Sequence, residues 1–301
     1  ITPGSIHILK ITSSPHPVLQ VHAYLNSHKH HNLKYICLLG SDKELPHYEL
    51  EDRTGNDPVV YTDNLYGMYS IPSEQERYEG NIIPAIPVSR IPSTDPILIQ
   101  RLLSVQRDLH PSWEQALCIS AGAWESDSST VLEELSVSTE RLKLVPPNDI
   151  DDWESIFKSG RYYFNVHGSN TTPIWYGDNG NPLFRDFPKA LSASIVQKYS
   201  CQLNSIVVCE ACYGAYIDST CSPSESISYS FLDQGASCFI GSTIIAWCPS
   251  QGTGQADDIA IGSFHFLDQG QGIASALNSA KETIASFPLL LIFSIALYRY
   301  N

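Results

Sequence analysis

Short apolar runs alternate along this chain with segments whose apolar residues recur at helical spacing. Strand-like runs lie at 6–12, 33–40, 82–90, 116–121, 142–145, 162–167, 205–212, 238–247 and 288–297. Helical spacing occurs at 18–27, 97–109, 130–142, 151–159, 190–199, 224–234 and 270–286. Because strand-like and helix-like segments alternate, the pattern predicts a doubly wound α/β fold with a mostly parallel sheet.

Two features of the first 112 residues predict how the chain is divided. Residues 45–79 are rich in Pro, Gly, Asp, Asn and Tyr without sustained periodicity, and such long excursions inside compact domains tend to be functional. The helical segment 97–109 ends before His110-Pro111, where proline disfavours continuation. We therefore expect a smaller α/β subdomain at 1–112 and a larger one at 113–301.

Composition narrows the choice of partner. The 301 residues are 43% apolar, enough for a sizeable core, and carry a net charge of −14. This acidity disfavours a phosphate backbone or anionic lipid as partner and would attract a basic peptide. The apolar stretch Pro288–Leu297 is about half as long as a membrane span and is typical of a buried strand. We expect no nucleic-acid and no membrane partner.

Cysteine usage indicates a reducing compartment. Most of the eight cysteines lie inside apolar runs without zinc-ribbon spacing, which is typical of buried free thiols. The chain as given starts without a signal peptide, so a cytoplasmic location is favoured, although the sequence does not identify the compartment. His28, His30 and His31 follow a helical segment and are better explained as solvated cations at its C-terminus than as metal ligands.

Two apolar runs end in reactive residues. Tyr162–Val166 leads to His167, and Ser205–Val208 leads through Cys209 to Cys212. The two residues are 45 positions apart, which is room for a strand, a loop, a crossover helix and the next strand. Adjacent parallel strands would then present an imidazole and a thiol at one sheet edge.

This pair of residue types predicts nucleophilic catalysis on an amide. A thiol attacks as thiolate, and a neighbouring imidazole can take its proton and return it to the leaving amine. Gly168 would let the main chain approach a substrate, so the N–H groups of Gly168 and Cys212 are candidates for an oxyanion hole. Taken singly, His167 could be a buried structural histidine, Cys212 a core thiol and Gly168 a turn residue.

Several further segments carry a resemblance to a known family. Glu210-Ala211-Cys212-Tyr213-Gly214 is a variant of the caspase signature, with a His upstream. Other matching segments, in chain order, are Leu38–Asp42 with Leu45-Pro46, Thr62–Gly67, Pro87–Pro92, Gln115–Ile119, Asn165–Ser169 and Ser242–Ile244 leading to Trp247. The chain resembles the caspase-like cysteine peptidases, most closely the gingipain type, with the CHAT-domain peptidases as relatives.

The resemblance implies a fold, an activity and a site. It implies a caspase-like three-layer sandwich preceded by a smaller α/β subdomain, and peptide-bond hydrolysis by a His-Cys dyad through a thioester. His167 then matches the general base and Cys212 the nucleophile.

The same resemblance places three residues at the substrate. Trp247 matches an aromatic residue of the pocket for the side chain before the scissile bond, and Glu210 borders that pocket. Asp127 is a counterpart of the acidic residue in Arg-specific gingipains, on a loop that is shorter here. These acids would favour Arg or Lys in a protein or peptide substrate, although each could equally pair with a neighbour or lie in solvent.

Some family features are missing or unassigned. Leu297–Asn301 stands where a Gly-Asp-Pro motif is expected. Gingipains hold structural calcium, and the acidic loop 49–57 could bind it, but no Asp-x-Asp-x-Asp-Gly array is present, so no metal ligand and no other cofactor is assigned. The alternatives are a latent CHAT-like peptidase activated by a regulatory partner or by self-cleavage, a catalytically silent scaffold, and an acyl-transfer enzyme.

Overall fold

The computed structural model describes most of the chain. The described residues are 6–11, 16–28, 32–51, 57, 59–78, 82–104, 113–147, 150, 152–216, 222, 225–246, 254, 256–285 and 295–297.

A six-stranded sheet forms the centre of the described part of the larger, C-terminal region. Its strands, in spatial order, are β12 (Ile295–Leu297), β11 (Cys238–Ser242), β10 (Ile206–Cys209), β7 (Arg161–Asn165), β5 (Ala116–Ala121) and β6 (Leu142–Val145). All neighbours pair in parallel except β12, which is antiparallel to β11. Strands β5, β7, β10 and β11 are buried along their full length, as expected of strands covered on both faces.

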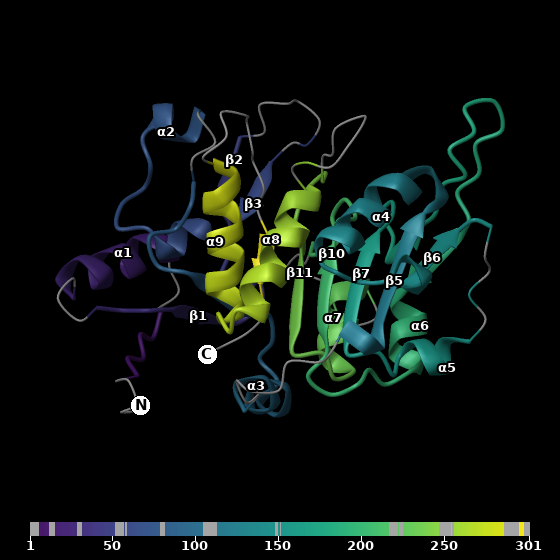
Figure 1. Ribbon diagram of the computed structural model, residues 1–301. Helices are drawn as coiled ribbons and strands as arrows, with labels where there is room; N and C mark the ends of the chain where they lie inside the picture. Colours follow the sequence, from purple (N-terminus) through teal and green to yellow (C-terminus); the bar gives the residue numbers. More distant parts are fainter. Residues whose placement is uncertain are drawn as a thin grey trace.

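Helices cover both faces of this sheet, as the α/β pattern predicts (Figure 1). On one face, α4 (Glu125–Glu134), α8 (Ala256–Asp268) and α9 (Ile273–Ala285) pack on Tyr163 and Val208. On the other, α3 (Pro96–Leu103), α5 (Trp153–Ile156), α6 (Ala193–Lys198) and α7 (Ile227–Asp233) pack on Phe164 and Val207. The predicted three-layer caspase-like sandwich is confirmed.

Smaller elements complete these layers. Short 3-10 helices lie at η3 (Trp113–Gln115), η4 (Gly122–Trp124) and η5 (Thr139–Arg141), and a hairpin is formed by β8 (Ile174–Tyr176) and β9 (Lys189–Ser192). The hairpin follows β7 and returns the chain to α6. Within the described residues no helix is long and apolar enough to span a bilayer.

The N-terminal region forms a further core of its own. It comprises α1 (Pro17–Ser27), β1 (Ile36–Leu39), β2 (Tyr48–Leu50), β3 (Val60–Thr62), η2 (Asn64–Gly67), α2 (Glu74–Tyr78) and β4 (Val88–Ile91). Strands β1 and β4 pair in parallel, and β2 and β3 pair antiparallel. Ile244, which follows β11, packs into this core. The predicted boundary at residue 112 lies outside the described residues and stays a prediction.

Several sequence-based predictions of elements were wrong or incomplete. Residues 6–11 form no strand, because they pair with no described strand and leave Ile6 and Ile8 75% and 88% exposed. Helix α8 was missed, as were β8 and β9, and the excursion 45–79 contains β2, β3, η2 and α2. The helix expected at 130–142 lies at 125–134 instead.

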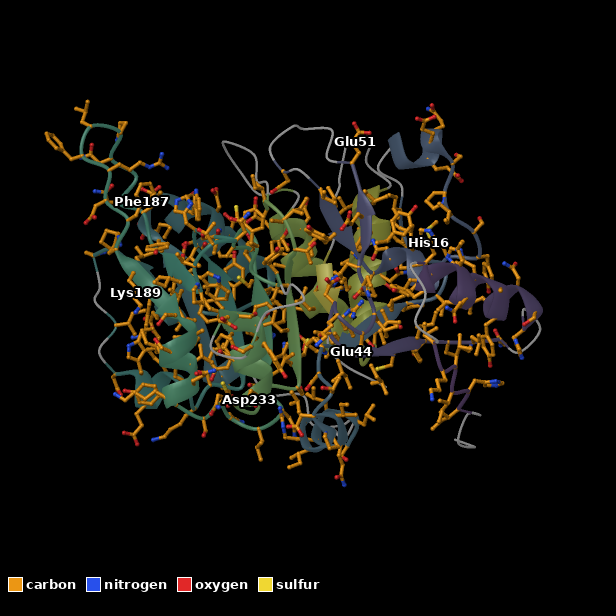
Figure 2. The ribbon with its side chains drawn as sticks, turned by 180° about the vertical axis from the view of Figure 1, so that it is seen from behind. His16, Glu44, Glu51, Phe187, Lys189 and Asp233 are labelled. Carbon is orange, nitrogen blue, oxygen red and sulfur yellow. The ribbon has the colours of Figure 1, made fainter. Side chains whose placement is uncertain are left out.

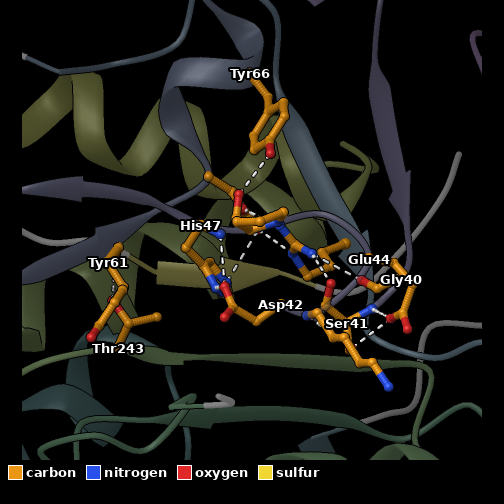
Figure 3. A network of polar contacts seen from close by, with 12 residues as sticks. Gly40, Ser41, Asp42, Glu44, His47, Tyr61, Tyr66 and Thr243 are labelled. Carbon is orange, nitrogen blue, oxygen red and sulfur yellow. Dashed lines mark hydrogen bonds and ion pairs between the residues drawn. The ribbon is translucent and has the colours of Figure 1, made fainter. Parts of the chain in front are cut away.

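A buried network of charges holds the N-terminal region together (Figure 3). The Arg90 guanidinium is fully buried and donates to both carboxylate oxygens of Asp63, at 2.7 and 2.6 Å, and to the Gly40 carbonyl at 2.9 Å. His47 Nδ1 lies 2.8 Å from Asp42 Oδ1. Lys281 of α9 donates to Asn64 at 3.0 Å, and burial lowers its pKa to about 7 although Asp63 opposes this. Asp42, Asp63 and Arg90 come from three separate segments that carry the family resemblance.

The network predicts a large loss of stability when its central anion is neutralised. Asp63→Asn would leave the Arg90 guanidinium buried without its counter-charge, and we expect the free energy of unfolding in urea to fall by about 3–5 kcal/mol. Glu154→Gln is the control, because the Glu154–Lys158 pair is 3.9 Å long and solvent-exposed, and its loss should leave no measurable change. Equal stability of the two variants would contradict the structural role of the network.

Candidate active site

His167 and Cys212 lie at the same edge of the sheet because their strands are in register. Strands β7 and β10 are parallel neighbours, and their last registered pair is Phe164 with Cys209. His167 and Cys212 are each the third residue beyond that pair. The Glu210 N–H donates to the Phe164 carbonyl at 2.8 Å and extends the ladder past the last pair. The juxtaposition expected from their spacing therefore follows from strand pairing.

The main chain after His167 touches the main chain of Cys212. A Cβ atom on Gly168 would lie 1.8 Å from the Cys212 carbonyl oxygen, so only glycine allows this approach. Among the described residues, no backbone carbonyl accepts from the N–H of Gly168 or from that of Cys212. Two N–H groups at adjoining strand ends are what an oxyanion would need.

The turn after Cys212 is held in an uncommon conformation. Tyr213 has a φ of +54°, a region that costs a non-glycine residue about 1–3 kcal/mol. Its N–H donates to the Ile244 carbonyl at 2.8 Å, and its hydroxyl donates to Asp57. Asp57 also accepts from the Ile245 N–H at 3.2 Å. The N-terminal region thus supplies a carboxylate that pins the turn bearing the thiol.

Cys212 is a partly exposed thiol in its resting state. Burial raises the pKa of the Cys212 thiol, and the nearby Asp57 carboxylate adds to the effect. The S–H donates to the Ala246 carbonyl at 3.8 Å. The protein environment therefore does not stabilise a resting thiolate, and attack on a substrate would require a base to remove the proton.

Asp178 orients the His167 ring. His167 Nε2 lies 3.0 Å from Asp178 Oδ2, which also accepts from Arg185 at 3.0 and 2.6 Å, while Asp178 Oδ1 accepts from the Gly180 N–H at 2.9 Å. Burial opposes ionisation, but these hydrogen bonds outweigh it and lower the pKa of Asp178 to about 2. An ionised Asp178 accepts the Nε2 proton and leaves Nδ1 as the basic nitrogen.

The ring and main chain of His167 are fixed from other sides as well. Trp124 and Phe187 lie with their ring centroids 4.5 and 5.2 Å from the imidazole. His167 also exchanges two backbone hydrogen bonds of 2.9 Å with Tyr176 of β8. The imidazole is therefore held between aromatic rings with one nitrogen committed to Asp178.

Acidic groups gather on the α4/α8 face of the sheet, beside this edge. Glu210 follows β10 and shares the face of Val208, Asp257 lies in the first turn of α8, and Asp127 lies in that of α4. Burial raises the pKa of all three carboxyl groups. The rise is strongest for Glu210, whose pKa is raised further by the nearby Asp257. Within the described residues, Glu210 Oε1 and Asp257 Oδ1 have no hydrogen-bond partner.

The structure thus groups most of the residues singled out in the sequence. His167, Gly168 and Cys212 meet at one edge, and Glu210 and Asp127 lie in one acidic group, whereas Trp247 lies outside the described residues. Sequence reasoning missed Asp178, Arg185 and Asp257. The one sequence signal near Asp178 was the density of turn-forming residues at 177–182, which indicates a loop. Nothing in the sequence distinguished Asp178 from Asp186 in the same loop.

The described residues offer no group of three His, Cys, Asp or Glu side chains arranged to hold a metal ion. The acidic loop 49–57 considered for calcium includes residues 52–56, which lie outside the described part, so the calcium expectation stays untested.

The resting thiol predicts a particular pH dependence of alkylation. Because the pKa of Cys212 is raised, we expect its reaction with iodoacetamide to be slower at neutral pH than that of a free cysteine derivative, and to keep rising above pH 9. Mass spectrometry of peptides from the native protein would follow Cys212, with buried Cys118 as the unreactive control. A plateau of the rate below pH 8 would show a lowered pKa and contradict the prediction.

Comparison with known proteins identifies the fold and the family. No curated protein sequence matches significantly. Among solved structures, the Arg-specific cysteine proteinase gingipain R is similar with a TM-score of 0.64, 14% identity, and coverage of 96% of this chain and 68% of that one. The complex of the pro- and mature domains of RgpB from Porphyromonas gingivalis gives a TM-score of 0.62 and 12% identity, covering 95% of this chain and 69% of that one.

A third solved structure, that of a protease, has a TM-score of 0.54 and 13% identity, covering 79% of this chain and 52% of that one. At such identities the likeness shows the fold alone. The sequence model of peptidase family C25 matches residues 18–294, which is most of the chain. The chain therefore belongs to peptidase family C25, and it is a cysteine-type peptidase with a gingipain-like fold.

Proposed function

We propose that the protein is an endopeptidase that cleaves after Arg or Lys, with Cys212 as nucleophile and His167 as general base and acid. The observation that carries the proposal is the main-chain contact of Gly168 with Cys212, because it joins the base and the thiol at one sheet edge. Asp178 acts as a positioning residue through its bond to His167 Nε2.

The reaction follows from these positions. Nδ1 of His167 takes the thiol proton as Sγ attacks the scissile carbonyl, and the oxyanion accepts from the N–H groups of Gly168 and Cys212. The imidazolium then gives its proton to the leaving amine, which departs and leaves a thioester on Cys212. Water attacks the thioester while His167 takes a proton, and the returning proton restores the thiol as the carboxylic acid product leaves.

The acidic group suits a cationic side chain before the scissile bond. Glu210, Asp257 and Asp127 have raised pKa values, so protonated and ionised forms coexist nearer to neutral pH than in water. A guanidinium or ammonium group would favour the ionised forms, supply hydrogen bonds to the unpartnered oxygens and release protons. Substrate affinity should then rise as the pH rises through these raised pKa values.

A latent enzyme is a second candidate. The thiol donates to the Ala246 carbonyl, and no hydrogen bond joins Cys212 to His167 among the described residues. This favours a resting arrangement that substrate, a regulatory partner or self-cleavage must rearrange before Sγ faces the imidazole. Full activity of the isolated, uncleaved chain would argue against it.

Removal of the nucleophile tests the main proposal. We expect Cys212→Ala to lower hydrolysis of an Arg or Lys aminocoumarin reporter by at least about 1,000-fold, because the thioester can no longer form. Cys37→Ala is the matched control and should keep wild-type turnover, since Cys37 belongs to the N-terminal β1. Turnover retained by the Cys212 variant would remove the assignment.

Neutral replacements in the acidic group test the specificity. We expect the double variant Glu210→Gln/Asp257→Asn to lower kcat/KM for Arg and Lys reporters by about 10- to 100-fold, through the loss of a buried charge pair with the substrate. Turnover of a glutamine reporter should stay unchanged or rise. Glu133→Gln, on the exposed side of α4, is the control. An equal loss on all reporters would make the two acids structural rather than selective.

A further inference from the structure

The loop between β8 and β9, residues 177–188, presents bulky apolar side chains to solvent beside the candidate base. Leu183 is 83% exposed and Phe184 is 77% exposed at its tip. Phe187, at its base, is 45% exposed, and its ring makes a T-shaped contact with that of His167. Figure 2 shows Phe187 at the end of the molecule from which this loop projects. Apolar groups gathered next to a functional site are typical of a contact surface.

The loop is held in one conformation by amide side chains. The Asn181 side-chain oxygen accepts from the N–H groups of Leu183 and Phe184, at 2.9 and 3.2 Å. The Asn179 side chain accepts from the N–H groups of Asn181 and Asp186 and donates to the Phe184 carbonyl at 2.7 Å. The apolar tip is therefore pre-organised, which reduces the entropy lost when it binds a partner.

The base of the loop fixes its position relative to the two reactive residues. The Ala123 N–H donates to the Asp178 carbonyl at 2.9 Å, and the Asp178 N–H donates to the Val145 carbonyl at 3.1 Å. The loop thus rests on the ends of β5 and β6. Since the sheet order is β10-β7-β5-β6, it lies on the side of His167 opposite to the strand that leads to Cys212.

This position identifies which part of a substrate the loop would meet. His167 must give its proton to the leaving amine, so the segment after the scissile bond departs on the imidazole side. We propose that loop 177–188 is a docking element for apolar residues on the C-terminal side of the scissile bond of a polypeptide substrate. The inference rests on the proposed peptidase function and adds a second selectivity to the basic residue before that bond.

Two peptides that differ only after the scissile bond test this. Both carry Arg before the bond, one is followed by Leu-Phe and the other by Gly-Ser, and an Arg aminocoumarin reporter has no residue there. We expect wild-type kcat/KM to favour the Leu-Phe peptide about tenfold or more, from partial burial of two apolar side chains. Leu183→Ser/Phe184→Ser should abolish that preference and leave the reporter and the Gly-Ser peptide unchanged. Leu203→Ser, which is also exposed but follows α6, is the control.

The outcomes separate this inference from the proposed function. Cleavage with an equal preference in wild type and loop variant overturns the loop inference and leaves the peptidase proposal intact. If wild type cleaves neither peptide, binding of the labelled Leu-Phe peptide to the Cys212→Ala chain is measured by fluorescence anisotropy, with and without the loop substitutions. An affinity that the loop substitutions leave unchanged overturns the docking inference. If sedimentation shows that wild type is a dimer and that the loop substitutions make it a monomer, the loop serves self-association, and the docking inference is also overturned.

Discussion

The registered pairing of β7 with β10 is the constraint on which the site depends. The chain runs three residues beyond the last registered pair on each side to reach His167 and Cys212, and the absence of a side chain on Gly168 lets the two segments touch. The parallel register fixes where the two strands end along the strand direction. The close main-chain contact fixes the distance between the two segments that follow them. The imidazole and the thiol are therefore placed by backbone geometry, while their chemistry is set by neighbouring side chains.

Electrostatics divides the site into two halves. On the imidazole side, Asp178 is kept ionised by Arg185, Gly180 and His167 despite its burial. On the α4/α8 face, Glu210 Oε1 and Asp257 Oδ1 have no hydrogen-bond partner among the described residues. Although the Gly254 N–H donates to the other Asp257 oxygen, burial raises the pKa of both carboxyl groups. The pKa of one carboxyl group in this part of the molecule is thus lowered, while the pKa values of two others are raised. Asp178 is therefore an ionised hydrogen-bond acceptor, whereas Glu210 and Asp257 ionise at a higher pH than free carboxyl groups.

The sequence predicted the features that depend on local pattern. Continuous apolar runs identified β5 and β6 at their true bounds, and the spacing of His167 and Cys212 anticipated their adjacent strands. Features that arise from tertiary contacts were missed. Asp178 acquires its importance from Arg185 and from the backbone on which the hairpin rests, and a linear pattern records neither of these contacts.

Helix α8 was obscured by Gly262, which lets Ala280 of α9 approach closely. Ile6 and Ile8 resemble a strand but find no described partner.

The Asp57 carboxylate links the two regions of the molecule chemically as well as sterically. It accepts from the hydroxyl of Tyr213 and from the N–H of Ile245, so the turn after Cys212 and the segment after β11 share one anchor in the N-terminal region. The smaller region therefore supports the turn that carries Cys212. Without that region, the turn that follows Cys212 would lose the hydrogen bond from the Tyr213 hydroxyl to Asp57 while Tyr213 still held its positive φ.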